Sequence, residues 1–264
     1  MISGLIIYNA TDRKKNSWFI NRCLKGLNDD SFSLFYLDED EVINYLKDHQ
    51  VDFVINRSRN SSLIKQLENL GIRCFNNYLT NKIANDKYAT YLFLKENDIP
   101  CLKSTLDINT ITNYPIVMKR LNGHGGQEVY LVNNKEEALA IEKAHPSQYL
   151  YQKYYPNSGD LRLYVLNQKV IAAVLRSNSS DFRSNYSLGG TVSLVKPDPS
   201  LVETALQIER LLNATYLGVD FLKVNDTYLV NEIEDPVGAR MLYQTSDIDI
   251  IDLFIKCIKQ SLNK

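Results

Sequence analysis

The chain has 264 residues, of which 44% are hydrophobic and 23% are charged, and its formal net charge is −1. This length and composition are typical of a globular protein built as one large domain or as two to three small ones. The near-neutral charge gives no reason to expect nucleic acid or an anionic membrane as a partner, and the apolar run near the amino terminus (MISGLIIYNATDRKK) is too short to span a bilayer and lacks the features of a signal peptide.

Strands and helices alternate over the first eighty residues. Short apolar runs predict strands over residues 4–8, 33–37 and 51–56. Helical spacing predicts helices over residues 17–27, 39–47 and 62–70, the last one ended by Gly71. This alternation indicates a parallel sheet covered by helices, and such sheets bind ligands beyond the carboxyl ends of their strands. Arg57 and Arg59 directly follow the third strand and are placed to meet an anionic ligand, although solvated loop cations are an equal alternative.

A second block of elements extends from residue 81 to residue 148. It begins with an amphipathic helix predicted over residues 81–97, which ends before Pro100 because a residue that precedes proline is pushed out of helical geometry. The elements that follow are a strand over residues 116–119, a glycine-rich loop over 123–126, a strand over 128–132, and a helix over 135–144 that begins at Asn133 or Asn134.

The glycine-rich loop suggests a phosphate site. Glycines let backbone N–H groups approach phosphate oxygens, so Gly125 and Gly126 could cover a triphosphate as a flexible lid. The loop is neither a Walker A loop nor a dinucleotide fingerprint, because a strand follows it, and hairpins also use glycine for geometry alone. Lys119 lies in the apolar strand before the loop, where a phosphate would pair with a buried ammonium. The alternative is a lysine that points to solvent from an edge strand.

The third block, from residue 149 onward, is rich in strands (YLYQKYY, LRLYVL, KVIAAVLR) and contains helices predicted over residues 200–212 and 248–262. Its segment SDFRSNYSLGGTVS concentrates hydrogen-bond donors in Arg183, Ser184 and Asn185, with Arg176 just upstream. Guanidinium groups recognise phosphate and carboxylate, and phosphoryl transfer depends on positioning and charge neutralisation. A polar surface loop is the alternative.

The last predicted hairpin carries three carboxylates, Asp220, Glu232 and Glu234, in otherwise apolar strands. A three-residue loop at residues 225–227 would place Asp220 opposite Glu232 on one face, where like charges need a compensating cation. Oxygen-only ligands suit Mg²⁺ or Mn²⁺, which usually also hold substrate phosphates. A two-residue loop would send Asp220 and Glu232 to opposite faces and would indicate solvated surface charges. A structural ion-pair network is a further alternative to a metal site, because it also perturbs acidic groups.

The ordered series of these motifs resembles the ATP-grasp superfamily, and specifically the RimK-like α-L-glutamate ligases. The motifs are Lys87 in NDKYATYLFLKENDIP, Lys119 before the glycine loop, QKYY, GDLRLYVL, DFRSN followed by a glycine pair, and GVDFL…VNEIE. The resemblance covers essentially the whole chain. It implies an α/β and α+β fold, in which an N-terminal α/β pre-grasp domain (1–80) precedes a small lid subdomain with its linker helix (81–148) and a C-terminal subdomain with the metal site (149–264).

The resemblance also implies roles for individual residues. Lys87 and Lys119 match the lysines that hold ATP phosphates, and Lys153 and Tyr154 match the hinge whose backbone meets the adenine. The remaining matches are Asp160 near the ribose, Arg183, Ser184 and Asn185 on the nucleotide, Asp220, Glu232 and Glu234 as the metal triad, and Arg176 and Arg240 as contacts of an acyl phosphate.

Three departures from the family pattern limit what can be transferred. The third metal ligand is usually Asn and is Glu234 here, which adds a negative charge and favours two bound Mg²⁺ ions, or leaves Glu234 turned elsewhere. The hinge position of Lys153 is usually Glu, so a side-chain contact to the nucleotide is put in doubt. The family's N-P-S-P-G stretch reads EDPVG here, near the second substrate, so the substrate's identity does not carry over.

The implied function is an ATP-dependent carboxylate–amine ligase that forms an amide through an acyl phosphate, with ATP and Mg²⁺ or Mn²⁺ as cofactors. Its substrates would be an amino acid or a peptide, with a protein or peptide acceptor and a homo-oligomer as further options. One alternative is a ligase that crosslinks a ribosomal peptide, and another is a non-catalytic ATP-binding regulatory module.

The cysteines give no sign of a metal site or of disulfide bonds. Cys23, Cys74, Cys101 and Cys257 are widely separated and form no C-x-x-C pair. The three histidines are equally dispersed. This pattern predicts buried thiols in a reducing compartment, and we expect a cytoplasmic protein.

Overall fold

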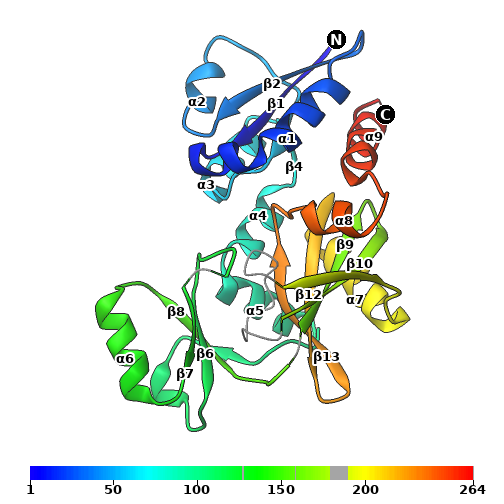
Figure 1. Cartoon of the computed structure of the whole chain (residues 1–264). Coiled ribbons are helices and arrows are strands. Elements are labelled where there is room, and N and C mark those ends of the chain that lie inside the picture. The colour runs from blue at the N-terminus through cyan, green and yellow to red at the C-terminus, as the bar shows by residue number, and fades with distance from the viewer. Residues whose placement is uncertain (127, 158, 179–189, 264) are drawn as a thin grey trace.

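The computed structural model describes residues 1–126, 128–157, 159–178 and 190–263, and it contains three separate β-sheets (Figure 1). The first sheet and the C-terminal helix lie at one end of the molecule. The second and third sheets lie side by side toward the other end, with helix α5 (Lys87–Glu96) between them and helix α4 (Tyr78–Ala84) between α5 and the first sheet.

The first sheet is the predicted parallel sheet, with strand order β2-β1-β3-β4. Its strands are β1 (Ile2–Tyr8), β2 (Phe32–Asp38), β3 (Phe53–Asn56) and β4 (Arg73–Phe75). Its helices are α1 (Ala10–Gly26), α2 (Val42–Tyr45) and α3 (Ser61–Asn69). Helix α1 has a kink at Asn16 (φ −120°, ψ 16°), and the part after it corresponds to the predicted helix. The polar part before the kink has no apolar spacing and was not predicted; the side chain of Asn9 caps it by accepting a hydrogen bond from the Asp12 N–H (2.8 Å). The glycine cap of α3 is confirmed, since Gly71 has a φ of +80°.

The long helix predicted over residues 81–97 is wrong, because the chain forms two helices, α4 (Tyr78–Ala84) and α5 (Lys87–Glu96). Asp86 interrupts them in an extended conformation (φ −130°, ψ 111°) and its carboxylate accepts hydrogen bonds from the N–H groups of Tyr88 (2.8 Å) and Ala89 (2.9 Å). A capping aspartate therefore starts a new helix inside an apolar pattern that looks continuous. As a result, Lys87 is the first residue of α5.

The second sheet is antiparallel, with strand order β5-β8-β6-β7. Its elements are β5 (Ser104–Thr105), the short 3₁₀ helix η1 (Ile108–Thr110), β6 (Ile116–Arg120), β7 (Val129–Val132), α6 (Lys135–Ala144) and β8 (Tyr149–Lys153). Helix α6 begins after Asn134, which is one of the two residues predicted as its N-cap. Strand β8 starts at residue 149, where we expected the C-terminal subdomain to begin. It pairs with β5 and β6, however, so the second sheet extends to Lys153. The domain boundaries otherwise remain predictions.

The third sheet is antiparallel, with strand order β11-β10-β9-β12-β13. Its strands are β9 (Gly159–Leu166), β10 (Lys169–Ser177), β11 (Thr191–Val195), β12 (Tyr216–Val224) and β13 (Thr227–Glu234). One face buries Leu163, Val165 and Leu217 against α7 (Pro199–Leu212) in a common core. The other face carries the polar residues of β9, β12 and β13 described below. Because side chains alternate along a strand, the sheet holds this core on one face and, on the other, both the polar site and the apolar residues that pack toward the first sheet.

The C-terminal segment returns to the first sheet. After α8 (Arg240–Thr245), helix α9 (Ile250–Leu262) packs beside α1, as Figure 1 shows. Phe254 and Ile258 of α9 share one core with Ile6 of β1 and Tyr216 of β12. Among the described residues, no helix combines the length and apolar character that crossing a membrane requires.

Candidate active site

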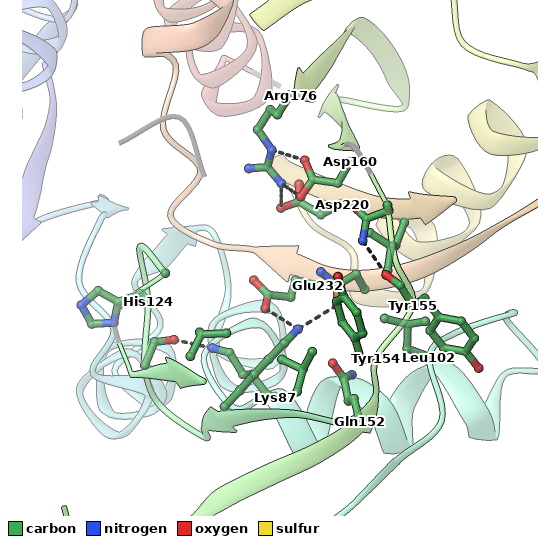
Figure 2. Close-up of a pocket in the computed structure, with 18 of the residues that line it drawn as sticks. Lys87, Leu102, His124, Gln152, Tyr154, Tyr155, Asp160, Arg176, Asp220 and Glu232 are labelled. Carbon is green, nitrogen blue, oxygen red and sulfur yellow. Dashed lines mark hydrogen bonds and ion pairs between the residues drawn. The ribbon is translucent and has the colours of Figure 1, made fainter. Parts of the chain in front are cut away.

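A pocket of about 800 Å³, counting space open to solvent, lies between the second and third sheets (Figure 2). Strands β6, β7 and β8 supply one wall, and β9, β10, β12 and β13 supply the other. At one end, Tyr154 and Tyr155 follow β8 beside Leu102, and at the other end Lys87 and Glu232 approach each other. The pocket thus has an apolar and aromatic end and a charged end.

The charged end depends on an irregular hairpin between β12 and β13. The loop has two residues, Asn225 and Asp226, because Val224 pairs directly with Thr227. That loop length alone would place Asp220 and Glu232 on opposite faces. A β-bulge between Phe221 and Asp220 shifts the register, so Asp220 nevertheless pairs with Glu232 and Asn231 is the extra residue. The loop therefore has the shorter of the two lengths considered, but the bulge gives the pairing of Asp220 with Glu232 that was expected only of a three-residue loop.

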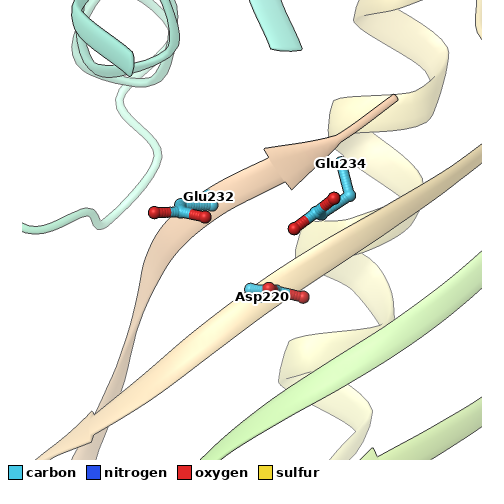
Figure 3. A group of neighbouring side chains, drawn as sticks. All are labelled: Asp220, Glu232 and Glu234. Carbon is cyan, nitrogen blue, oxygen red and sulfur yellow. The ribbon is translucent and has the colours of Figure 1, made fainter. Parts of the chain in front are cut away.

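The bulge brings Asp220, Glu232 and Glu234 together (Figure 3). One carboxylate oxygen from each lies within 4.8 Å of those of the other two. Mg²⁺ holds oxygens at about 2.0–2.1 Å in an octahedron, so two ligands of one ion lie roughly 3–4 Å apart. The three oxygens are close enough that small side-chain rotations would bring them onto one ion.

Two buried arginines offset the negative charge of this group. Arg162 donates to both oxygens of Asp220 (Nε–Oδ1 2.6 Å and Nη2–Oδ2 2.7 Å) and to Oε1 of Glu234 (2.7 Å). Arg176 donates to Oδ2 of Asp220 (2.6 Å) and pairs through both nitrogens with Asp160. Acidic and basic side chains therefore alternate in one ion-pair network across the sheet, in the order Asp160, Arg176, Asp220, Arg162 and Glu234.

The two arginines also determine the protonation of the buried aspartates. Burial alone would raise the pKa of Asp220, but the charges of Arg162 and Arg176 outweigh it and lower that pKa to about 2. Burial raises the pKa of Asp160 above its ordinary value, because its pairing with Arg176 only partly offsets the loss of water. Asp220 is thus held as a carboxylate at neutral pH.

The donor set fits a divalent cation. A carboxylate offers about four acceptor positions, and the arginines occupy three on Asp220. Glu232 accepts one bond from Lys119 and Glu234 accepts one from Arg162, within the part of the chain that the structure describes. Counted over the described residues, each of the three carboxylates, which all line the first pocket, therefore keeps acceptor capacity, and oxygen-only sites of this kind suit Mg²⁺ or Mn²⁺.

Two lysines reach the same point from the second sheet and from α5. Lys119 is buried (7% exposed), and its Nζ donates to Oδ1 of Asn231 (2.8 Å) and to Oε1 of Glu232 (3.2 Å). The alternative of a solvent-facing edge position is wrong, since β6 lies between β8 and β7. Lys87 donates to the carbonyl oxygen of Gly123 in the glycine loop.

The ion pair favours the charged form of Glu232 more than the charged form of Lys119. Burial lowers the pKa of Lys119, and Glu232 restores it only in part. Burial would raise the pKa of Glu232, but Lys119 and Lys87 outweigh that effect and lower it. Glu232 therefore faces the pocket as a carboxylate between two cations.

The remaining predicted residues fall into three groups. Gly125, Gly126, Lys153, Tyr154 and Asp160 all line the pocket. Gly125 and Gly126 have φ values of +68° and +75°, which residues with a side chain rarely adopt, so the sharp turn of the loop explains both glycines. The carboxylate of Asp160 is engaged by Arg176, and its expected place near a ribose stays a prediction.

The other two groups lie away from the pocket or outside the described chain. Arg240 is exposed, donates to the carbonyl oxygen of Lys15 (2.6 Å) and is absent from the described lining of the pocket, so its expected contact with an acyl phosphate stays a prediction. The predicted donors of the third block, Arg183, Ser184 and Asn185, lie outside the described residues.

Of the two arginines expected to meet an anionic ligand beside the first sheet, Arg59 lines a cavity and Arg57 does not line a described one. Arg57 is buried and donates to the carbonyl oxygen of Val237 (2.7 Å) and to the hydroxyl of Tyr8 (3.2 Å), so it joins the first sheet to the segment after β13 and does not face the described pockets. Arg59 pairs with Asp12 and lines a second, polar pocket of about 480 Å³.

This second pocket adjoins the first. Asn85, Thr90, Asn122 and Asp235 line it, and it shares six residues with the first pocket. The shared residues are Lys87, Gly123, His124, Asn231, Glu232 and Glu234. Two of the three carboxylates, Glu232 and Glu234, therefore line both cavities, whereas Asp220 lines the first pocket.

The sequence did not point to Arg162 or Asn231, although one signal was present for Arg162. Asp160 and Arg162 alternate with leucines in GDLRLYVL, and opposite charges at such spacing in a buried strand indicate an internal ion network. Asn231 has no such signal, because its position depends on the bulge.

Comparison with known proteins gives consistent matches. The family model of the RimK-like ATP-grasp domain matches residues 71–258. The chain is 31% identical over 269 residues to Uncharacterized protein MG011 of Mycoplasma genitalium, covering 99% of this chain and 94% of that protein. It is 28% identical over 224 residues to Probable alpha-L-glutamate ligase 1 of Shewanella denitrificans, covering 77% and 74%.

The fold has solved counterparts as well. A crystal structure of D-alanine–D-alanine ligase from Bacillus anthracis complexed with ATP superimposes with a TM-score of 0.76, over 100% of this chain and 98% of that chain. The sequence identity is 16%, so this likeness concerns the fold alone.

Proposed function

This chain belongs to the RimK-like ATP-grasp family, and we propose that it is an ADP-producing ligase that joins the carboxylate of one substrate to the amine of an amino acid or peptide. The family and the fold expected from the ordered motifs are confirmed. The observation that carries the proposal is the meeting of three carboxylates and two lysines across one pocket.

In this proposal the first pocket holds ATP. The adenine lies at the apolar end against Leu102, Val117 and Leu222, beside the backbone of Lys153 and Tyr154. The triphosphate extends toward Lys119 and Lys87 under Gly125 and Gly126. Ammonium groups at this end neutralise phosphate charge, which is the main requirement of phosphoryl transfer.

Asp220, Glu232 and Glu234 would hold Mg²⁺ or Mn²⁺ at the charged end. A bound divalent ion supplies neutralisation of the phosphate oxygens and fixes their direction. The third carboxylate, Glu234, adds a charge that favours two ions over one. Arg162 and Arg176 keep the aspartate ligand ionised and hold it in place, and Asn231 orients Lys119.

The second pocket is the proposed acceptor site, because it meets the first at the carboxylates. The substrate carboxylate attacks the γ-phosphorus, ADP departs, and an acyl phosphate forms. The amine then attacks the acyl carbon, the bond from carbon to the phosphate oxygen breaks, and phosphate leaves. Lys87 and Lys119 neutralise the charge that develops on the transferred group, and no side-chain nucleophile is required.

One experiment tests the activity and identifies the substrates together. The purified protein is incubated with ATP, Mg²⁺ and pooled amino acids and short peptides, while ADP and new product masses are measured. A product mass names both substrates, and a product formed only from peptides favours a peptide-modifying ligase. ATP binding without ADP formation against the whole pool would contradict the ligase proposal and favour a regulatory module.

The metal assignment has its own test. Replacing the carboxylate by an amide in Glu232→Gln should lower substrate-dependent ADP release by at least about 10²–10³-fold, because a neutral ligand weakens both the ion and the pairing with Lys119. Glu203→Gln is the matched control, since Glu203 is exposed on α7 and pairs only with Arg210 among the described residues. Turnover retained in Glu232→Gln would contradict the metal assignment.

A further inference from the structure

The glycine loop places a histidine at the junction of the two pockets. His124 lines both of them, together with Lys87, Glu232 and Glu234. Figure 2 shows His124 on the far side of Lys87 from the hinge residues Tyr154 and Tyr155. If the adenine lies at the hinge and the phosphates lie between Lys87 and Glu232, His124 stands beyond the phosphates, on the acceptor side.

We propose that His124 is a catalytic residue that takes a proton from the attacking ammonium group of the acceptor. The inference rests on the proposed function, since it concerns the second step of the ligation. An amine acceptor enters as an ammonium ion at neutral pH and has no lone pair for attack until it loses a proton.

The hydrogen bond of His124 leaves one ring nitrogen available as a base. Nδ1 lies 3.3 Å from the carbonyl oxygen of Asn122. A carbonyl oxygen carries no proton, so this contact requires the proton on Nδ1. In the neutral ring, Nε2 then carries the lone pair, and the loop backbone fixes this tautomer. The side chain is exposed, so an incoming substrate can reach it.

The surrounding charges keep the ring neutral. Partial burial and the cations Arg59 and Lys87 lower the pKa of His124 from its ordinary 6.5, while the bond to Asn122 and the carboxylate of Asp12 oppose this only in part. These groups face the ring from α1, from the loop after β3 and from α5. A neutral imidazole at physiological pH accepts a proton, whereas an imidazolium cannot.

The other shared side chains are engaged in other tasks. Lys87 donates to Gly123, and the charges of Glu232 and Glu234 are required for the proposed metal. Asn231 has no basic group. Among the six described residues that line both pockets, His124 is therefore the one suited to accept a proton.

Bonds and protons are conserved in the proposed amide-forming step. The ammonium gives one proton to Nε2 of His124, and the free amine forms the new C–N bond. The bond between the acyl carbon and the phosphate oxygen breaks, and phosphate departs with its electron pair. The second N–H proton passes to the departing phosphate, so an amide, hydrogen phosphate and an imidazolium result.

The test compares two nucleophiles on the same acyl phosphate. Hydroxylamine is a weak base that is largely unprotonated at neutral pH, so it needs no base to attack. With ATP, Mg²⁺ and the substrate pool, His124→Gln should form hydroxamate at the wild-type rate, whereas amide formation falls by about 10²–10³-fold. His49→Gln is the matched control, because His49 is exposed and stacks on Tyr45 of the first sheet's helix α2.

Two further measurements separate a catalytic from a structural role. The acidic limb of the wild-type pH profile for amide formation should be absent in His124→Gln, and added imidazole should restore amide formation in His124→Gly. Amide formation unchanged in His124→Gln, with hydroxamate formed, would overturn this inference and leave the proposed function intact. A wild-type protein that forms neither hydroxamate nor ADP overturns both.

Discussion

Replacing Arg162 by Met tests how the carboxylate group is held together. The substitution keeps a long side chain but removes three charge-assisted hydrogen bonds to Asp220 and Glu234. Asp220 keeps only its bond from Arg176 among the described residues, and Glu234 loses its bond from Arg162. Four carboxylates then face three cations, which leaves excess negative charge in a largely buried region; the groups are Asp160, Asp220, Glu232 and Glu234 against Arg176, Lys119 and Lys87.

The expected loss of stability follows from the burial of this network. The side chains of Arg162 and Asp220 are 7% and 3% exposed, so solvent screens the pair little. Removing one partner of a buried ion pair typically costs about 3–5 kcal/mol. For a chain of this length, that corresponds to a decrease in Tm of about 6–20 °C.

Divalent cations should reverse part of the loss. In the wild type Arg162 donates hydrogen bonds to two of the three carboxylates and so competes with a divalent cation for them. In Arg162→Met this competition is removed, and the excess negative charge attracts the cation more strongly. A ligand present at a hundredfold excess over its dissociation constant stabilises the folded state by about 2.7 kcal/mol. We therefore expect a larger rise of Tm with Mg²⁺ in the variant than in the wild type.

Thermal unfolding in EDTA and in millimolar MgCl₂ measures both effects. Arg210→Met is the matched control, because Arg210 pairs with Glu203 on the surface, where both side chains are at least half exposed and such a pair contributes about 0–1 kcal/mol. A Tm of Arg162→Met equal to that of the control would refute the stabilising role of the network. An equal Mg²⁺ effect in variant and wild type would refute the competition between Arg162 and the cation.

Two further predictions concern Lys119 and acid stability. Lys119→Met should lower ATP turnover by about 10²–10³-fold in steady-state assays, because a phosphate-binding charge is lost. The urea midpoint should change little, because a costly buried ammonium is removed and its partner Glu232, whose side chain is 28% exposed, can regain water, unlike the deeply buried Asp220; a fall in stability that tracks the fall in turnover would speak against this separation. The carboxyl of Asp220 has a pKa lowered from 3.8 to about 2, so its contribution is fully present above pH 3.8 and is lost as the pH falls toward 2. The free energy of unfolding should therefore fall between about pH 5 and pH 2 by about 2 kcal/mol more in the wild type than in Asp220→Asn, and parallel curves would contradict the lowered pKa.

Local patterns predicted most of the elements, because their causes are local. The alternation of strands and helices in the first sheet and the caps at Gly71 and Asn134 depend on a few neighbouring residues. The break between α4 and α5 was missed, although its cause is also local. Asp86 is a good cap, but the apolar spacing around it continues without interruption.

The site was predicted less completely, because parts of it depend on long-range contacts. The carboxylates were identified since charge in apolar strands is unusual, yet their pairing depends on the bulge at Asn231. Val230, directly before the bulge, exchanges backbone hydrogen bonds with Pro100 and Leu102, and Asn231 accepts from Lys119. Partners 112 or more residues away fix this register, so no local pattern could reveal it.

The shared core of the first sheet, the third sheet and α9 determines which part of the molecule can move. Ile6, Tyr164 and Phe254 belong to one continuous apolar cluster, whereas Met118 and Tyr151 of the second sheet belong to a separate one. Separating the first and third sheets would expose that common core to water, at a large cost. Across the first pocket, by contrast, the second sheet contacts the third sheet through polar contacts such as that of Lys119 with Glu232. If the first pocket holds the proposed nucleotide, we therefore expect the second sheet to be the part that moves when the nucleotide enters and the product leaves.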